Sequence, residues 1–299
     1  MNKIDGIGVV VLNYNKKDDL LLALKSIYAS DYPKISIVVV DNNSTDGSAD
    51  AVSEIYPDTP LIRNPVNSGV SKGRNVGWQF AKEHFEFEYI IFLDDDTEVE
   101  PDYFTKIIQA YQEYPEVGIV TGKSYINKKT KIFCSVGISA NLYTGLIHDI
   151  GVGKKDEGQY DTTCYRRACG GFAFSCRREL FDKLNAFDEN YSPYGWEDVD
   201  LCFKAEKAGQ KTLYVHDALV VHKGTKAGRA PVPSYERHKI KNYLYLLKQH
   251  TNILQKMCCC VCIPLKGAYI IGEMILTGHP KVILSQFRGF FEGLINSRR

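Results

Sequence analysis

Hydrophobic runs in the first 120 residues alternate with segments of helical spacing. Residues 7–12 and 35–40 are short, continuously apolar and rich in β-branched side chains, which is typical of strands covered on both faces of a parallel sheet. Residues 18–30 between them carry an apolar stripe of helical period. The alternation continues with helices at 71–84 and from Pro101 to about Tyr114, and with strands at 89–93 and 117–120. This pattern predicts a doubly wound α/β sheet, in which ligands bind beyond the carboxyl ends of the strands.

The second half of the chain changes character. Residues 132–174 show short strands and glycine-rich turns, and from Ser234 onward the pattern is mainly helical. We expect Pro264 and Pro280 to break this helical region. The other predicted elements are helices at 177–184 and 198–208 and short strands at 213–215 and 219–221.

Charge is distributed unevenly along the chain. The net charge is +1, yet the segment from Lys223 to Arg299 has 13 basic and three acidic residues, so it carries +10 and the rest carries −9. A basic segment of this kind favours contact with an anionic membrane leaflet or a lipid pyrophosphate over nucleic acid; an ordinary solvated basic face is the alternative. The apolar stretch 257–276 contains Pro264, Lys266 and Glu273, which makes it a poor membrane span but an acceptable interfacial helix.

Composition narrows the class of protein. The 299 residues are 44% hydrophobic and 24% charged, which is typical of a globular chain and excludes disordered and fibrous classes. Residues 1–8 lack the basic start and long apolar run of a signal peptide, so we expect synthesis in the cytosol. The nine cysteines have no repeated zinc-type spacing and are interpreted as free thiols. The single CxxC, Cys259 to Cys262, fits a buried or membrane-facing stretch better than a metal site.

Three consecutive carboxylates, Asp94, Asp95 and Asp96, follow the predicted strand at 89–93 directly. They would repel one another unless a cation or solvent relieved the repulsion, and their hard oxygen ligands suit Mg²⁺ or Mn²⁺, which could bind a diphosphate. The alternative is an acidic turn that caps the next helix.

Two other acidic motifs fail on spacing. An EF-hand loop beginning at Asp94 requires Gly at 99 and Glu at 105, where the chain has Val99 and Thr105. The aspartyl-phosphatase pattern DxDxT requires Thr two places after the second Asp, but Thr97 follows Asp96 immediately.

A second acidic group, Glu197 and Asp198, follows Trp196 and opens a predicted helix. A carboxylate near a diphosphate and partly shielded by an aromatic ring can serve as a general base. Acids that simply cap the helix and favour its dipole are the alternative. His216 and His222 flank a predicted strand, and either one could be a ligand or an ordinary strand-end residue.

The segment 67–77 has glycines at every fourth position, which permits close helix packing, and Arg74 within it could reach a phosphate or a base. It matches neither the GxGxxG nor the Walker pattern, so a dinucleotide or ATP site loses support.

Taken together, these segments resemble glycosyltransferase family 2, the GT-A fold enzymes that build bacterial polysaccharides, and particularly its rhamnosyl and galactosyl transferases. The matching pieces occur in family order over about residues 1–230, with Asn185-Ala186 replacing a common glycine pair. They are VVLNYN, VVVDNNSTDGS (38–48), NSGVSKGRNVG (67–77), FLDDDT (92–97), GGFAFSCRRELFDKLNAFDENY (170–191), YGWEDVDLCFKAEKAG (194–209) and VVH (220–222).

The resemblance implies specific roles. A nucleotide-sugar pocket would be formed by Asn13, Tyr14, Asp41, Asn67, Arg74, Asn75, Asp94 and Asp95. Mg²⁺ or Mn²⁺ would be held by Asp94, Asp96 and His222, and would stabilise charge on the departing phosphate. Asp198 matches the catalytic base, Glu197 would support it or bind acceptor, and Trp196 would form a wall of the acceptor site.

The resemblance also implies the fold and the reaction. The fold would be a GT-A, Rossmann-like, mainly parallel sheet flanked by helices, with a catalytic domain at 1–230 and a basic helical extension at 231–299. Residues 1–120 would bind the nucleotide and 121–230 the acceptor. The enzyme would transfer sugar from a UDP or dTDP donor to a hydroxyl of a glycan or lipid-linked acceptor with inversion, peripherally on the inner face of the cell membrane. A sugar nucleotidyltransferase, a polyprenyl-phosphate sugar synthase and an inactive glycan-binding module remain alternatives.

Overall fold

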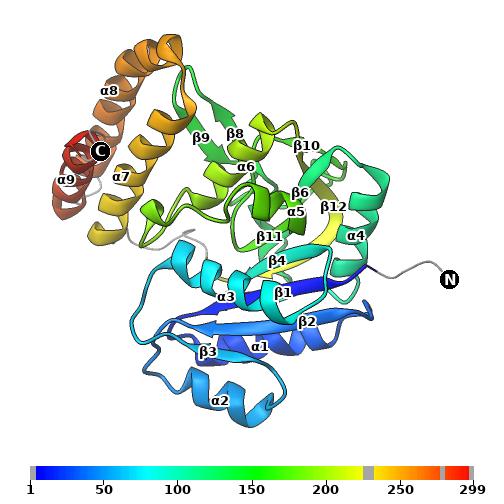
Figure 1. The fold of residues 1–299 in the computed structure, drawn as a ribbon. Helices are drawn as coiled ribbons and strands as arrows, with labels where there is room; N and C mark the ends of the chain where they lie inside the picture. The colour runs from blue at the N-terminus through cyan, green and yellow to red at the C-terminus, as the bar shows by residue number, and fades with distance from the viewer. Residues whose placement is uncertain (1–4, 225–231, 277–279, 296–299) are drawn as a thin grey trace.

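The computed structural model describes residues 5–224, 232–276 and 280–295, and of residues 265–276, Pro280 and Ile295 it describes only the backbone. Within this part, a ten-stranded mixed sheet carries helices on both faces, and a group of helices follows at the C-terminal end (Figure 1). The strands of the main sheet are β1 (Ile7–Asn13), β2 (Ile35–Asp41), β3 (Leu61–Arg63), β4 (Tyr89–Asp94), β5 (Thr97–Val99), β6 (Val117–Asn127), β7 (Ile132–Ser135), β10 (Cys164–Arg166), β11 (Ala173–Arg177) and β12 (Lys211–His222). A separate hairpin consists of β8 (Ile138–Asn141) and β9 (Leu146–Asp149). The helices are α1 (Lys17–Tyr28), α2 (Ser48–Ile55), α3 (Val70–His84), α4 (Tyr103–Glu113), α5 (Arg178–Lys183), the 3₁₀ turn η1 (Glu189–Tyr191), α6 (Glu197–Lys207), α7 (Pro233–His250), α8 (Ile253–Leu276) and α9 (Pro280–Ile295).

The nucleotide-binding half predicted from the sequence folds as a parallel sheet in the order β3-β2-β1-β4. In its register Asn13 lies beside Asp41, and Leu12 lies beside Asp94. The polar residues that end these strands therefore gather at one edge, as expected for parallel strands of a doubly wound sheet. Beyond β4, the sheet continues with β11, which is antiparallel to both β4 and β6, and then with β12 beside β6.

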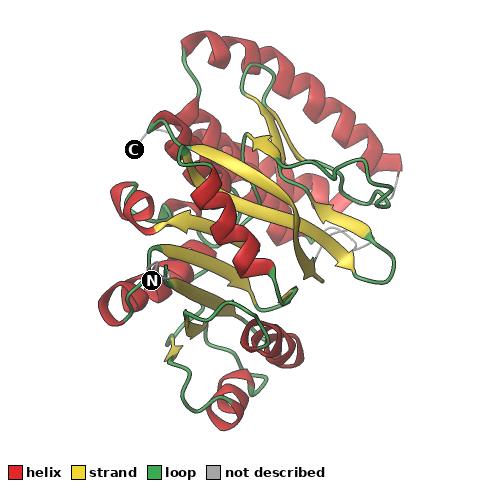
Figure 2. Cartoon of the chain, turned by 90° about the vertical axis from the view of Figure 1, so that its right-hand side faces the viewer, coloured by secondary structure: helices red, strands yellow, loops and turns green. Residues whose placement is uncertain are grey.

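Both faces of the sheet are covered, because alternate strand residues enter two different hydrophobic clusters. Val9 and Val11 pack with α1 and α4 on one face, whereas Val10 and Leu12 pack with α3, α5 and α6 on the other. The chain therefore forms layers of helix, sheet and helix, and Figure 2 shows one helix crossing in front of the strands. The continuously apolar strand sequences follow from this burial on two sides.

The C-terminal helices share the core of the sheet domain. Leu246 and Leu247 of α7 and Cys259 of α8 belong to the same hydrophobic cluster as Leu201 of α6. Helix α9 then lies along α7, where Gly289 and Gly293 leave room for the backbone of the neighbouring helix. The first helix of the extension is thus packed as an integral part of the fold.

Three boundaries differ from the sequence prediction. Pro264 lies inside α8 and does not end it, because a proline removes one helical hydrogen bond while the turns on both sides keep theirs. The predicted strands at 213–215 and 219–221 form one strand, β12, whose register shifts between Val215 and Leu219 and so absorbs the polar residues between them. Helix α4 begins at Tyr103, two residues after Pro101.

In the described part of the chain, no helix combines the length and the apolarity that crossing a membrane requires. The residues at 1–4, and Lys226, Arg229, Arg298 and Arg299 of the basic segment, lie outside the described part of the chain.

Candidate active site

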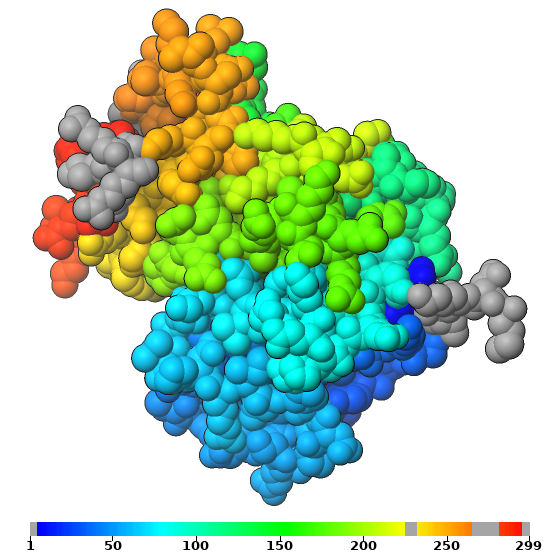
Figure 3. Space-filling model, in the orientation of Figure 1, coloured from blue at the N-terminus to red at the C-terminus, as the bar shows by residue number. Residues whose placement is uncertain are grey.

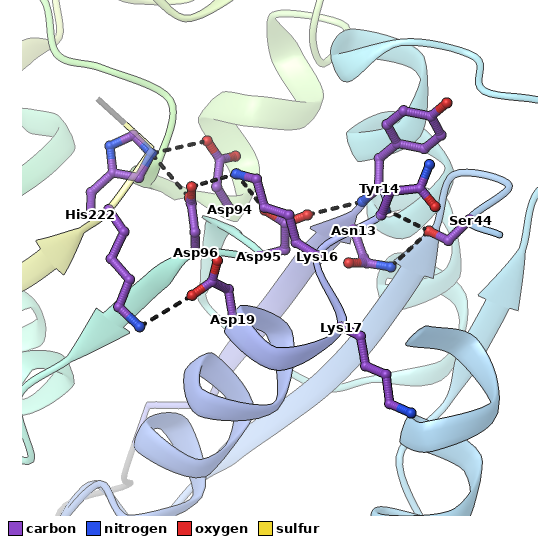
Figure 4. A network of polar contacts seen from close by, with 12 residues as sticks. Asn13, Tyr14, Lys16, Lys17, Asp19, Ser44, Asp94, Asp95, Asp96 and His222 are labelled. Carbon is purple, nitrogen blue, oxygen red and sulfur yellow. Dashed lines mark hydrogen bonds and ion pairs between the residues drawn. The ribbon is translucent and has the colours of Figure 1, made fainter. Parts of the chain in front are cut away.

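The parallel strand ends bring the first group of predicted site residues together (Figure 4). The buried Asn13 side chain donates from Nδ2 to Asp41 Oδ1 at 2.7 Å and to Ser44 Oγ at 3.0 Å. Asp41 in turn accepts from the backbone N–H of Ser44 at 3.0 Å through its other oxygen. Asn13 and Asp41 thus form a buried polar pair, fixed by hydrogen bonds, at the carboxyl ends of β1 and β2.

Tyr14 and Asn67 lie close to this polar pair: Tyr14 follows Asn13 in the chain, and Asn67 bonds to Asn42, which follows Asp41. The Tyr14 backbone N–H donates to Asp95 Oδ2 at 2.9 Å, while 47% of the residue is exposed. An exposed aromatic residue beside the buried polar pair of Asn13 and Asp41 is available to stack on a planar ligand. The Asn67 side chain accepts from Asn42 Nδ2 at 3.1 Å and from the Gly69 N–H at 3.0 Å, so it holds the loop that leads into α3.

Asp94, Asp96 and His222 form a group that can hold a divalent cation. One ligand atom from each lies within 4.8 Å of the other two. His222 Nε2 is 3.2 Å from Asp96 Oδ1 and 3.8 Å from Asp94 Oδ2 (Figure 4). Two carboxylates and an imidazole are ordinary ligands for Mn²⁺, and Mg²⁺ also accepts the carboxylates.

The backbone beside this group leaves space for a ligand. Gly224 passes so close that a Cβ there would lie 2.2 Å from Asp96 Oδ2 and 3.3 Å from His222 Nε2. A side chain at position 224 would therefore fill the space between the candidate ligands. Together with the chemistry of the donors, this space fits a bound cation.

Positive side chains already surround these carboxylates. Lys16 contacts Asp96 through its ammonium group and lies 3.3 Å from Asp95 Oδ1. Burial raises the pKa of Asp95 to about 7, although Lys16 opposes the shift. Burial also acts on Asp96, but hydrogen bonds from His222 and Lys16 outweigh it and hold the pKa of Asp96 well below its usual range. Asp96 is consequently ionised at neutral pH and ready to bind a cation.

His222 is oriented by two neighbours that the sequence did not reveal. The Cys134 thiol lies 3.4 Å from Nδ1 of His222, and the Phe172 ring stacks on the imidazole with centroids 4.4 Å apart. Burial lowers the pKa of His222, but the hydrogen bonds with Asp96 and Cys134 outweigh it and raise the pKa to about 10. His216 lies elsewhere, with Nδ1 3.0 Å from Thr163 Oγ1, so the geometry favours His222 as the ligand.

Arg74 connects the candidate cation site to the second acidic group. Its buried guanidinium donates to Asp94 Oδ1 at 2.7 Å, to Glu197 Oε1 at 3.1 Å and to the Gly171 carbonyl at 2.9 Å. A Cβ at Gly171 would lie 2.5 Å from this guanidinium, so glycine is required for the approach. With these partners Arg74 bridges two carboxylates; its direct contact with a nucleotide stays a prediction.

Asp198 has the environment of a general base. Its Oδ2 accepts from the Gly171 N–H at 2.6 Å and its Oδ1 from the Val199 N–H at 2.7 Å. Burial and then the adjacent Glu197 raise the pKa of Asp198 to about 7, against the opposing effect of Arg74. A carboxylate with a pKa near neutrality is suited to accepting a proton in a transition state.

Glu197 and Trp196 face different partners from Asp198. The Glu197 side chain is buried, accepts from Arg74 and, through Oε2, from the Gly195 N–H at 2.8 Å. This position fits a residue that supports Asp198 better than one that binds an acceptor. The Trp196 indole packs against Tyr243 of α7 at 5.4 Å between ring centroids.

Asn75 points toward a different part of the fold. Its side chain donates to the Phe187 carbonyl at 2.8 Å and accepts from the Phe187 N–H at 3.1 Å. These bonds fasten α3 to the segment before η1, and the predicted nucleotide contact of Asn75 stays a prediction. Lys16, Cys134, Phe172 and Gly171 are the site residues that sequence reasoning missed. Gly171 and Phe172 carried a signal, since they lie in the matching piece 170–191, and Lys16 directly follows the VVLNYN segment, whereas Cys134 carried none.

The family is established by comparison with known proteins. The family model described as glycosyl transferase family 2 matches residues 8–184, which is more than half of the chain. The chain belongs to glycosyl transferase family 2 and is a glycosyltransferase.

The chain is also similar in sequence to one curated relative and in fold to two solved structures. The N-acetylglucosaminyl-diphospho-decaprenol L-rhamnosyltransferase of Mycobacterium tuberculosis is 27% identical over 268 residues, which cover 83% of this chain and 86% of the relative. Residues 1–349 of TarS from S. aureus, in complex with UDP-GlcNAc, superpose with a TM-score of 0.62 at 16% identity, over 98% of this chain and 80% of that one. The mannosyltransferase PcManGT from Pyrobaculum calidifontis, in complex with GDP-Man and Mn²⁺, gives a TM-score of 0.60 at 16% identity, over 99% and 88%. These two structures share the fold, and the predicted GT-A sheet with flanking helices is confirmed.

Proposed function

We propose that the protein is a metal-dependent, inverting glycosyltransferase that moves a sugar from a UDP or dTDP donor to a hydroxyl of a glycan or lipid-linked acceptor in cell-surface polysaccharide synthesis. The observation that carries this proposal is the link made by Arg74, which joins Asp94 of the candidate cation site to Glu197, the neighbour of Asp198. A donor diphosphate at the cation site would therefore place its sugar near the base.

In this proposal each side chain has a distinct task. Asp41 and Asn13 hold the nucleoside, and Tyr14 stacks on its base. Asp198 takes the proton of the acceptor hydroxyl while that oxygen attacks the anomeric carbon from the face opposite the diphosphate, so the configuration inverts without a covalent enzyme intermediate. Arg74 holds the carboxylates of Glu197 and Asp94 in fixed positions relative to each other by donating a hydrogen bond to each. A Mg²⁺ or Mn²⁺ ion held by Asp94, Asp96 and His222 would supply positive charge for the leaving diphosphate.

The class of acceptor is supported by the mycobacterial relative. Its name describes rhamnosyl transfer to a sugar linked by diphosphate to a polyprenol, and the similarity extends along most of both chains. For the present protein we propose an acceptor of the same chemical class, a hydroxyl on a sugar that is attached to a lipid diphosphate. Nothing in this assignment requires nucleic acid as a partner.

A ligand screen followed by product analysis tests the function. Thermal unfolding is measured with UDP, dTDP and their sugars, each with and without Mn²⁺, because a ligand that binds only the folded state raises the midpoint. A donor that raises the midpoint only together with Mn²⁺ is then incubated with lipid-linked acceptors, and NMR of the product gives the anomeric configuration. Retained configuration refutes inversion. Release of pyrophosphate in a separate incubation with a nucleoside triphosphate and a sugar 1-phosphate would identify a nucleotidyltransferase.

The C-terminal helices support the proposed contact with a membrane surface. Helices α8 and α9 lie at the outer edge of the protein, as Figure 3 shows for the segments coloured orange and red. On α9 the exposed apolar residues recur at helical spacing and form one stripe: Leu284, Phe287, Phe291 and Leu294. On α8 the exposed apolar residues are Ile253, Leu254, Met257 and Val261. Apolar stripes with basic neighbours are typical of helices that lie in a lipid interface. The net charge of +10 on residues 223–299 favours anionic lipid.

We expect the full-length protein to co-sediment with anionic liposomes at low salt, and much less with neutral ones or at high salt, because each basic residue near the surface contributes about 1 kcal/mol. Replacing Phe287 and Phe291 with Ser removes the centre of the stripe and should reduce binding.

Matched substitutions of Ile55 and Val66, which are equally exposed on another part of the protein, serve as the control and should leave binding unchanged. Substitution is a cleaner test than truncation at Ser234, which would remove Leu246 and Leu247 from the core. Equal, negligible sedimentation in every condition would refute the membrane contact.

A further inference from the structure

The loop that presents the two catalytic-site acids is attached to the C-terminal helix α7. This loop, residues 191–198, runs from Tyr191 to Asp198 and enters α6. The Asn242 side chain of α7 is fully buried and donates from Nδ2 to the carbonyls of Tyr191 and, at 2.9 Å, Tyr194. One amide group therefore fixes the loop backbone at two points, three residues apart.

Further contacts extend along the same face of α7. The Tyr235 ring stacks on Tyr194 with centroids 4.7 Å apart, and the Lys239 carbonyl accepts from Trp196 Nε1 at 2.8 Å. Positions 235, 239 and 242 are separated by four and three residues, so they share one face of the helix. At the end of that face, His250 Nε2 lies 2.7 Å from Asp200 Oδ1 in α6. Helix α7 thus follows the loop from its start into α6.

The contact at Trp196 affects the direction in which the acids point. Trp196 has a φ of 78°, a left-handed conformation that is uncommon for a bulky residue and persists only where surrounding contacts enforce it. It is also the N-cap of α6, where its carbonyl accepts from the Asp200 N–H at 2.9 Å. The indole bond to α7 therefore helps to fix the backbone from which Glu197 and Asp198 leave.

We propose that Asn242 is a positioning residue for sugar transfer, which acts by holding loop 191–198 so that the Asp198 carboxylate meets the acceptor hydroxyl. This inference rests on the proposed function of Asp198 as the base. Donor binding should depend little on it, because Asn13, Asp41 and Asp94 are placed by the parallel strands and by their own hydrogen bonds.

The test compares Asn242→Leu, which keeps the size of the side chain and removes both donated bonds, with Leu246→Ala. Leu246 is equally buried and lies one turn further along α7, but it is an apolar side chain in the core cluster. For Asn242→Leu we expect kcat to fall by roughly 10- to 10²-fold, since small displacements of a catalytic group cost this much. The Kd of the donor nucleotide with Mn²⁺ should stay within about twofold. Leu246→Ala should lower the thermal midpoint, whereas its kcat per folded molecule should stay near that of the wild type.

A fluorescence measurement separates this inference from the proposed function. The chain has two tryptophans, Trp78 and Trp196, so Trp78→Phe leaves Trp196 as the only indole. In that background Asn242→Leu should shift the Trp196 emission and Leu246→Ala should not. If Asn242→Leu does not fold, Asn242→Ser is measured in its place, because its hydroxyl cannot reach both carbonyls. An unchanged kcat and emission in the folded variant, or a parallel loss of donor affinity, overturns the positioning role. Absence of transfer in the wild type would refute the proposed function, while the emission shift would still report on the loop.

Discussion

Asp198→Asn should lower the rate of sugar transfer by roughly 10²-fold or more, while donor binding stays near normal. The asparagine keeps the shape of the side chain but cannot take up the acceptor proton. Its amide oxygen can replace only one of the two oxygens that accept from the Gly171 and Val199 N–H groups. A stability loss of about 1 kcal/mol is therefore expected beside the kinetic effect, and thermal unfolding measures it.

The pH profile provides the control for this substitution. Because burial and Glu197 raise the pKa of Asp198 to about 7, the base is protonated below that pH in the free enzyme. The kcat/KM of the wild type should accordingly rise with pH up to about 7 and then level off, and this rise should disappear in Asp198→Asn. If transfer by Asp198→Asn stays within a few-fold of the wild type, the base lies elsewhere, and Glu197 becomes the next candidate.

The positions of the site residues could be predicted from sequence wherever a parallel strand ends. Continuous apolar runs indicate strands buried on both faces, and such strands align their carboxyl ends at one edge. Asn13, Asp41 and Asp94 each close such a run, so their gathering follows from local pattern and general geometry. The helical pattern likewise predicts α3 to within one residue, and so it places Arg74 on a helix that follows the sheet edge.

The partners of these residues could not be predicted, because they come from distant segments. Arg74 and Glu197 are 123 positions apart, and Cys134 and His222 are 88 apart. No local pattern states which helix face meets which loop, so the burial of Arg74 between two acids was missed. The contacts of α7 with loop 191–198 could not be predicted for the same reason, because its sequence indicates only a basic helix.

The irregular elements show a related limit. The register shift in β12 accommodates residues that are polar and therefore appeared to end a strand. Likewise, Pro264 carries a local signal against a helix, yet the hydrogen bonds of the flanking turns let α8 continue. In both places, contacts with the surrounding structure override the local sequence preference. Those contacts come from other segments, so they cannot be inferred from one segment alone.

Asp96→Ala should abolish the dependence of donor binding on Mn²⁺. Asp96 is 2% exposed and lies within reach of both other candidate ligands, so its loss removes a charged donor from a small site. It also leaves Lys16, which pairs with Asp96, as an uncompensated positive group beside the cation. Because loss of an outer-shell partner alone typically weakens metal affinity by roughly 10- to 10²-fold, loss of a ligand should cost at least as much.

Two histidine variants make this measurement specific. Mn²⁺ binding is followed by electron paramagnetic resonance and UDP or dTDP binding by calorimetry, with Asp96→Ala, His222→Ala and His216→Ala compared under the same conditions. His222→Ala should weaken the cation more mildly than Asp96→Ala, because the two carboxylates remain. His216 bonds to Thr163 away from the cluster, so His216→Ala should leave cation affinity unchanged. Unaltered Mn²⁺-dependent nucleotide affinity in a folded Asp96→Ala protein would refute the assignment of the metal site. If His216→Ala lowers the cation affinity and His222→Ala does not, the histidine ligand is His216.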